Sequence, residues 1–385
     1  MKKYTEGIAL GVVKSFYAIS NGLIGLFRNM LFARGAMPGD AKNILIYRVG
    51  NIGDIICAVA SMRAVRKKFN KAKISLLSSP GTPGAVGASE LLTGAEFLDD
   101  IIIYHRKDIK GLKGKLRFIN SLRMKKFDIF IELPMDLTNI FVELRNLFFA
   151  KIIGARKAFG FHISTIRVFT RVQSKYLKFC NETERLLEIL KKEGLDVKDI
   201  ESELTRSPED KKVIDNFLSS LKGKRLVVFN PNAKRKANLW PMDRFAEVGR
   251  WLIKSCDAQI LIIGGTHDYD RAEGLKESIG EGATNAAGGF TILQTLEIIK
   301  RSQLLISNDT GAVHMAASVG TPVIGIYAAW QIRGKWFPEG SDNIILREEP
   351  RCHACYCVEC SHRICLEAIG AEKVCAAAEE IFRRI

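Results

Sequence analysis

Short apolar runs alternate with segments of helical periodicity along most of this 385-residue chain. Such runs predict buried parallel strands, which we place at 43–49, 73–77, 101–104, 127–133, 225–230, 259–263, 304–306 and 323–327. Amphipathic helices are expected between them, most clearly at 55–69, 242–255 and 292–301. Strands that alternate with helices indicate doubly wound α/β sheets.

The runs fall into two groups on either side of a charged helical segment, 183–219. We therefore expect one α/β sandwich within 41–207 and a second within 208–350. The segment 1–40 precedes them, and a cysteine-rich tail with a terminal helix, 351–385, follows them.

The stretch 304–327, LLISNDTGAVHMAASVGTPVIGIY, carries the clearest candidate site. It predicts a strand, a polar turn, a helix and a second strand. A helix N-terminus presents unpaired N–H groups and a partial positive charge, so this turn suits a phosphate. Gly311 allows close backbone approach, and Asp309, Thr310 and His314 supply polar side chains. The alternative is a capped helix in an ordinary α/β core.

The turn after the first strand, GNIGD at 50–54, carries a carboxylate. It lacks the third glycine of the dinucleotide-binding fingerprint, and no acidic residue ends the second strand near Leu77, which argues against NAD. Asp54 lies at the carboxyl end of a strand, where ligands gather in open α/β sheets. It could accept a proton from a hydroxyl nucleophile, or it could simply be the N-cap of the next helix.

The second sandwich offers cations and a further carboxylate at the same edge. Lys234, Arg235 and Lys236 follow the strand 225–230, and Asp268 follows the strand 259–263. Cations there can neutralise a leaving diphosphate, although they could equally be solvated loop charges. A carboxylate in one half and phosphate-binding groups in the other suit transfer of a group from a nucleotide to a hydroxyl across a cleft.

The N-terminal segment is apolar but is interrupted by Lys14, Asn21 and Arg28 at seven-residue spacing. That spacing keeps the three side chains on nearly one helical face. The longest uncharged run, 15–27, is shorter than the roughly 20 residues that a membrane span needs. We therefore predict a helix in the membrane interface, with basic side chains near the headgroups, namely Lys2, Lys3, Arg28 and Arg34. The alternative is a helix packed on the protein's own core.

The chain has a formal net charge of +16, nine cysteines and no cleavable signal peptide. Its basic residues are dispersed and lack interleaved aromatics, which favours an anionic substrate and a membrane surface over nucleic acid. Nine cysteines without a cleavable signal peptide indicate a reducing, cytoplasmic compartment.

Five of the cysteines lie within residues 352–365. Cys352 and Cys355 form a C-x2-C pair, and Cys360 and Cys365 complete a set of four that could hold a structural zinc ion or an iron–sulfur cluster. The later gaps are irregular, so reduced structural thiols remain the alternative.

From residue 43 to the C-terminus, the chain resembles glycosyltransferase family 9, the ADP-heptose:lipopolysaccharide heptosyltransferases. The resemblance rests on NILIYRVGNIGDIICAVASMRAV, VVFNPNAKRKANLWPMDRFAEV, ILIIGGTHDYDRA and the D-T-G-x-x-H block at 309–314. It implies a GT-B fold, in which two Rossmann-like domains face each other across a cleft. It also implies that the terminal helix packs back on the first domain.

The resemblance further implies inverting transfer that requires no cofactor. Asp54 matches the catalytic base, on an acceptor-side loop with Gly50 and Gly53, and Asp309, Thr310, Gly311 and His314 match the nucleotide-sugar site. Asp268 matches an acidic position near the donor nucleoside. The lysine that often stands two residues before Trp-Pro is replaced by Asn238, so Lys234 or Lys236 would have to supply that charge.

These observations predict a heptosyltransferase that uses ADP-heptose or a similar donor. The expected acceptor is an anionic, lipid-linked glycan of the lipopolysaccharide-core type, at the inner face of the cytoplasmic membrane. One alternative is an enzyme of the same fold with another nucleotide-sugar and a different surface glycan. A second is a membrane-associated metal or redox protein that uses the cysteine tail.

Overall fold

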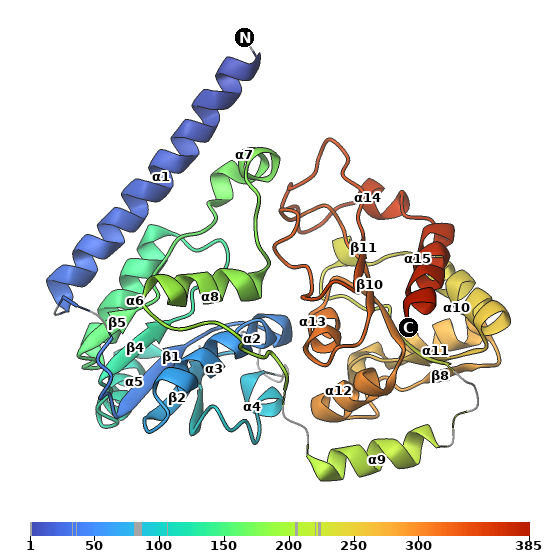
Figure 1. Cartoon of the computed structure of the whole chain (residues 1–385), viewed down its shortest axis with the longest axis horizontal. Helices are drawn as coiled ribbons and strands as arrows, with labels where there is room; N and C mark the ends of the chain where they lie inside the picture. Colours follow the sequence, from blue (N-terminus) through green and yellow to red (C-terminus); the bar gives the residue numbers. More distant parts are fainter. Residues whose placement is uncertain are drawn as a thin grey trace. The chain divides into compact units, whose positions relative to one another are not determined.

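The computed structural model describes residues 2–32, 34–35, 37–80, 87–105, 107–204, 207–219, 221 and 225–385, with the side chains of residues 2–8 and 168 excepted. The chain forms two compact units, Met1–Ser202 and Glu203–Ile385. Each unit is built around one sheet whose paired strands all run parallel (Figure 1).

The first unit has a five-stranded sheet in the order β3-β2-β1-β4-β5. Its strands are β1 (Asn43–Tyr47), β2 (Lys73–Ser78), β3 (Asp100–Ile103), β4 (Ile129–Glu132) and β5 (Lys157–Phe159). Its helices are α1 (Lys2–Leu31), α2 (Ile52–Ile56), α3 (Val59–Lys68), α4 (Ala88–Leu91), α5 (Gly111–Arg123), α6 (Ile140–Ile152), α7 (Thr170–Tyr176) and α8 (Glu182–Lys192). The carboxyl ends of β1 and β4 are adjacent, with Tyr47 paired to Glu132.

The second unit has a six-stranded sheet in the order β11-β10-β9-β6-β7-β8. Its strands are β6 (Arg225–Asn230), β7 (Ala258–Ile262), β8 (Ala283–Asn285), β9 (Leu304–Asn308), β10 (Val323–Ile326) and β11 (Ile344–Leu346). Its helices are α9 (Pro208–Leu218), α10 (Met242–Cys256), α11 (Tyr269–Ile279), α12 (Ile292–Arg301), α13 (Gly311–Ser318), α14 (Ile364–Glu367) and α15 (Ala371–Arg384), with 3-10 turns η2 (Lys236–Asn238) and η3 (Thr266–Asp268). Because β6 pairs with both β7 and β9, the loops after these strands meet at one edge.

The eight strands predicted from apolar runs are all present, with boundaries that shift by one or two residues where they differ. The predicted helix 55–69 is instead two helices, because α2 ends at Ile56 and α3 starts at Val59. The strands β5, β8 and β11 were not predicted, because they have three residues each and are too short to show a periodicity.

The terminal helix α15 packs within the second unit, against α10, as Figure 1 shows. Val374, Ala378 and Ile381 belong to the same hydrophobic core as the β6 residues Val227 and Phe229. The packing on the first domain that the resemblance implied is therefore wrong for this chain.

The predicted N-terminal helix is present as α1, which packs against α6 and α7. Of the basic side chains predicted near headgroups, Arg28 is instead paired within the protein. Asn21 accepts a hydrogen bond from Ile163 N (2.9 Å) and donates one to Ile163 O (3.1 Å). Arg28 forms an ion pair with Glu193, with a nitrogen–oxygen distance of 2.6 Å, and Tyr17 donates to Ser164 O. Asn21, Arg28 and Tyr17 thus all find their partners within the first unit, on the inner face of α1. Lys14 and Arg34 are exposed.

The opposite face of α1 is apolar and open to solvent. Six large hydrophobic side chains on it are 39% to 71% exposed: Val12, Phe16, Ile19, Leu23, Leu26 and Met30. The stretch Ala9–Leu31, only 17% of it buried, is long and apolar enough to cross a membrane by length and composition. The predicted contacts of Lys2 and Lys3 lie outside the described side chains.

Candidate functional site

The first candidate is the turn that carries Asp54, between β1 and α2. Asn51 is the N-cap of α2, and Asp54 is its third residue, whose Oδ2 accepts a hydrogen bond from Asn51 N (2.9 Å). Asp54 thus supports the helix start, but it is not the N-cap that the sequence left open. Gly50 closes the turn with φ +153°, and Gly53 lies inside α2.

A buried ionic network lies beneath Asp54. The guanidinium of Arg48, which is fully buried, stands 3.5 Å from Asp54 Oδ1 and 3.0 Å from Glu182 Oε1. Arg185 bonds the same Glu182 carboxylate from the other side at 2.7 Å. Arg48 also donates to the backbone oxygens of Leu133 and Pro134, at the end of β4. Through its contacts with the Asp54 carboxylate and backbone oxygen, Arg48 holds the Asp54 side chain in position.

The Asp54 side chain is 13% exposed, so it is not fully closed off from solvent. Burial raises its pKa above the ordinary value, and the Arg48 charge opposes that rise. A carboxylate with a raised pKa is a stronger proton acceptor than a free aspartate.

The second candidate is the turn between β9 and α13. Thr310 is the N-cap of α13, and its Oγ1 accepts hydrogen bonds from Ala312 N (3.3 Å) and from Asn230 Nδ2 (2.8 Å). Gly311 is the first helical residue. His314 lies one turn further on, is 7% exposed, and meets the Trp336 ring edge-to-face with centroids 6.2 Å apart. The predicted strand, turn and helix start are therefore present, and phosphate binding at this turn stays a prediction.

Two asparagines join this turn to the cation-bearing loop that follows β6. Asn308 donates to Pro231 O (2.8 Å) and accepts from Trp240 N (3.2 Å). Asn238, in the place of the family lysine, donates to Asp309 Oδ2 at 3.3 Å. Burial raises the pKa of Asp309 to about 6, while Trp330, Arg235 and Arg347 act in the opposite direction.

The three loop cations differ in their surroundings. The side chains of Lys234 and Lys236 are exposed. The Arg235 guanidinium instead lies over the Trp330 ring, 4.1 Å from its centroid. Asp268, at the end of β7, is partly exposed and accepts a hydrogen bond from Gly265 N (2.9 Å) at the start of η3. The second unit thus gathers Asp309, Thr310, Gly311 and the 234–238 loop at one edge, with Asp268 in the turn η3 that follows β7.

A family model of glycosyltransferase family 9 (heptosyltransferase) matches residues 115–364, which is more than half of the chain. The chain belongs to glycosyltransferase family 9. It is therefore an enzyme of glycosyl transfer, and the two parallel α/β units correspond to the GT-B fold. This confirms the fold and the enzyme class that were predicted from the sequence.

Relatives of this family 9 enzyme agree with that assignment. The lipopolysaccharide core heptosyltransferase OpsX of Haemophilus influenzae is 22% identical over 74% of this chain and 79% of its own length. The solved structure of ADP-heptose lipopolysaccharide heptosyltransferase II from E. coli aligns with a TM-score of 0.64 at 16% identity, over 89% of this chain and 99% of the other. The iron-containing dodecameric glycosyltransferase TibC from E. coli aligns with a TM-score of 0.54 at 11% identity, over 89% of this chain and 79% of the other.

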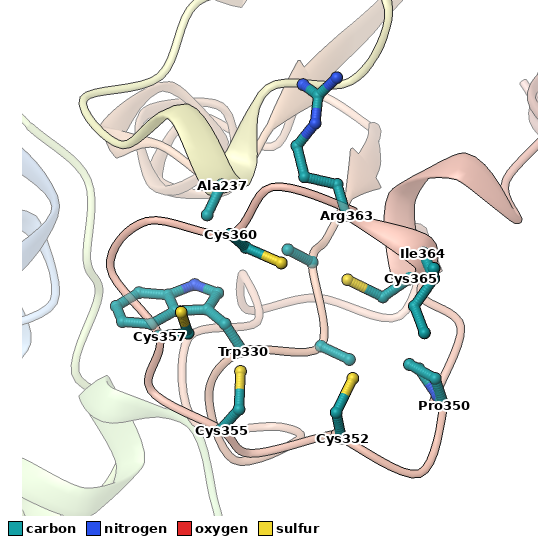
Figure 2. Close-up of a pocket in the computed structure, with 12 residues that line it drawn as sticks. Ala237, Trp330, Pro350, Cys352, Cys355, Cys357, Cys360, Arg363, Ile364 and Cys365 are labelled. Carbon is teal, nitrogen blue, oxygen red and sulfur yellow. The ribbon is translucent and has the colours of Figure 1, made fainter.

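The cysteine tail of the family 9 enzyme closes around one pocket of the second unit. Figure 2 shows the sulfur atoms of Cys352, Cys355, Cys360 and Cys365 directed toward this pocket. Cys357, Trp330 and Ala237 also line it. All nine cysteines are free thiols. Among the residues described, however, no three His, Cys, Asp or Glu side chains come close enough to hold a metal ion.

Sequence reasoning missed Arg48, Glu182 and Arg185, because charged residues in a helix or strand pattern read as surface positions. It also missed Trp330, whose ring lies against the Arg235 guanidinium. One signal was available for Arg48. It follows directly after an apolar strand and stands six residues before Asp54, at the same end of the sheet.

Proposed function

We propose that this enzyme transfers a heptose from ADP-heptose to a hydroxyl of an anionic, lipid-linked glycan, with Asp54 as the general base. The observation that supports this most strongly is the Asp54 carboxylate, reachable from solvent yet held from below by Arg48. The enzyme's family and its relatives' names support a heptosyl donor.

In this mechanism the acceptor hydroxyl gives its proton to Asp54 while its oxygen forms a bond to the anomeric carbon. The bond from that carbon to the diphosphate oxygen breaks on the opposite face, so the configuration inverts. The electron pair leaves with ADP, whose negative charge is stabilised by the N-terminus of α13 and by a loop cation. No metal is required for this sequence of steps.

The nucleotide is tested by comparing ADP, GDP and UDP in thermal shift, followed by transfer assays with the matching nucleotide-sugars. We expect ADP to raise the melting temperature most, because at equal concentration the ligand with the highest affinity stabilises the folded protein most. A response to GDP or UDP alone would favour the same-fold alternative with another nucleotide-sugar. A response to none of them would overturn the donor assignment.

We also propose that the enzyme works at the inner membrane surface, with the apolar face of α1 in the lipid interface. Residues 1–202 contain 34 Lys and Arg against 19 Asp and Glu, whereas residues 203–385 contain 24 against 23. The basic excess therefore belongs almost entirely to the unit that carries α1. Anionic headgroups attract such a unit, and the exposed side chains of α1 add hydrophobic burial.

Binding to vesicles of phosphatidylethanolamine with and without phosphatidylglycerol tests this surface. The double change Ile19→Glu and Leu26→Glu alters two exposed positions of α1 and should reduce vesicle binding at least tenfold. Val213→Glu, an exposed apolar position on α9 of the other unit, is the matched control. Wild-type binding that resists alkaline carbonate extraction would mean that α1 spans the membrane. Equal binding by all variants would exclude the α1 face.

Finally, we propose that Cys352, Cys355, Cys360 and Cys365 take up a zinc ion or an iron–sulfur cluster as a structural group, separate from transfer. Soft thiolates suit both metals, and four sulfurs directed toward one pocket support the assignment. The thiols would have to draw together on binding. Metal analysis of anaerobically purified protein should give one zinc ion or one iron–sulfur cluster per chain. The metal should be lost in Cys352→Ser but retained in Cys180→Ser, which changes an exposed cysteine outside the tail. A metal-free wild type would show that these are simply reduced thiols.

A further inference from the structure

The donor edge of the second unit lacks the lysine that family members often carry, and the residue in its place cannot supply a charge. Asn238 is buried and uses its amide nitrogen to bond Asp309. Its Oδ1 is buried without a hydrogen-bond partner, and the Trp330 side chain also lies beside Asp309. Buried polar atoms are rarely left unpaired, so this edge is incomplete without a ligand.

A diphosphate bound beside Asp309 would need a cation close to it. Asp309 ionises above a pH of about 6, so it is an anion at neutral pH. A diphosphate at the N-terminus of α13 would stand next to this anion and would be repelled by it. The partial charge of one helix end offsets only a fraction of that repulsion, so a full positive charge is needed close by.

The charges of Arg235 and Arg347 both favour the ionised form of Asp309, but the Arg347 guanidinium already donates its hydrogen bonds to protein groups. Arg347 donates to Glu349 Oε1 (3.0 Å), Ala328 O (3.1 Å) and Gln331 O (2.7 Å). Its side chain therefore braces the 328–331 segment that carries Trp330. Arg235 has a different environment, because its guanidinium lies face-on over the Trp330 ring and the side chain is otherwise exposed.

Trp330 is held firmly enough to orient that guanidinium. Its backbone oxygen accepts from Tyr356 N (2.8 Å), and the two rings meet edge-to-face at 5.6 Å. The neighbouring Ala329 O accepts from Ala354 N at 2.7 Å. Stacking leaves the edge of a guanidinium, with its N–H donors, free to face a ligand, and a planar fork suits two phosphate oxygens.

From these contacts we infer that Arg235, stacked on Trp330, is the residue that binds the donor's diphosphate and stabilises it as it leaves. The inference rests on the proposed function and deepens it, because it names the cation at the same site. It also gives the cysteine tail a role, since Tyr356 and Ala354 of the tail hold the platform on which Arg235 lies.

The test compares the affinities of ADP and adenosine for the full-length enzyme by calorimetry or competition. Arg235→Ala should weaken ADP binding by about 10- to 100-fold, the range for one charge-assisted hydrogen bond, and should leave adenosine unchanged. Arg235→Lys should fall between wild type and Arg235→Ala, because a lysine keeps the charge but loses the planar fork. Lys236→Ala, which removes a charge one residue away, should change either affinity by no more than about twofold.

A purely structural role for Arg235 would weaken ADP and adenosine alike, so the ratio of the two affinities separates the cases. The inference would be overturned if Arg235→Ala kept the wild-type ratio of ADP affinity to adenosine affinity. It would also be overturned if Lys236→Ala, and not Arg235→Ala, lowered that ratio. A wild type that does not prefer ADP over adenosine would contradict the proposed donor itself, which is a different result. Trp330→Phe keeps a ring face and should retain most of the ADP preference if stacking is what orients Arg235.

Discussion

Replacing Gly50 with alanine should disable the enzyme although the Asp54 carboxylate, which we assign as the base, is still present. Gly50 has φ +153°, and a Cβ added there would lie 2.3 Å from Asp54 Cβ and 2.5 Å from Asp54 Cγ. An ordinary contact between such atoms is about 3.4 Å or more, so Asp54 must move by roughly 1 Å. Gly50 N is tied to Ser79 O at 3.3 Å, which limits how far the turn itself can yield.

A displacement of about 1 Å at a reacting group can cost about 100-fold in rate. The strained backbone and the overlap together should lower the free energy of unfolding by about 1–3 kcal/mol. We therefore expect Gly50→Ala to fold, to bind ADP normally, and to lose about 99% of its turnover in an assay of ADP release with donor and acceptor present.

Gly154→Ala is the matched control. Gly154 also has a positive φ, +87°, but no atom lies within 4 Å of the position that its Cβ would occupy. It should lose a comparable part of its stability, about 1 kcal/mol, and keep its turnover. Wild-type turnover in Gly50→Ala, or an equal loss in both variants, would refute the link between this turn and Asp54.

Two further predictions follow from the buried charges. Glu182→Gln leaves Arg48 and Arg185 undercompensated, so the free energy of unfolding should fall by roughly 3 kcal/mol in denaturant titration. Because the Glu182 charge raises the pKa of Asp54, the acid limb of the kcat/KM profile should also move to lower pH, and an unmoved limb would count against Asp54 as the titrating base. The folded pKa of Asp309, about 6, lies above its ordinary value of 3.8, so this group's contribution to stability is lost as pH rises between the two. Asp309→Asn should remove that decline, so wild type should gain stability relative to the variant on lowering the pH from 7 to 4; parallel stability curves would show that Asp309 is not buried as described.

The elements that define the fold were predictable because their signals are local. The strand 225–230 and the helix 292–301 follow directly from an apolar run and from a 3.6-residue period, and Thr310 is a favoured N-cap residue. The three-residue strands β5, β8 and β11 were not predictable, since pairing to a neighbour defines them rather than their own sequence.

The sequence could not predict which groups the polar side chains would bond to. The seven-residue spacing of Lys14, Asn21 and Arg28 gives a shared helical face correctly, but it does not tell which way that face turns. Residues about 140 to 165 positions away, Ile163 and Glu193, determine that Asn21 and Arg28 turn inward. Arg48 was missed for the same reason, since Glu182 is 134 residues away.

The measurement that tests the central claim most directly is a comparison of Asp54→Asn with wild type for both ADP binding and turnover. The account predicts an unchanged Kd for ADP and a turnover reduced by about 100- to 10,000-fold, the range for loss of a positioned general base. Turnover within a few-fold of wild type, in a variant that folds and binds ADP, would contradict the assignment of Asp54 as the proton acceptor.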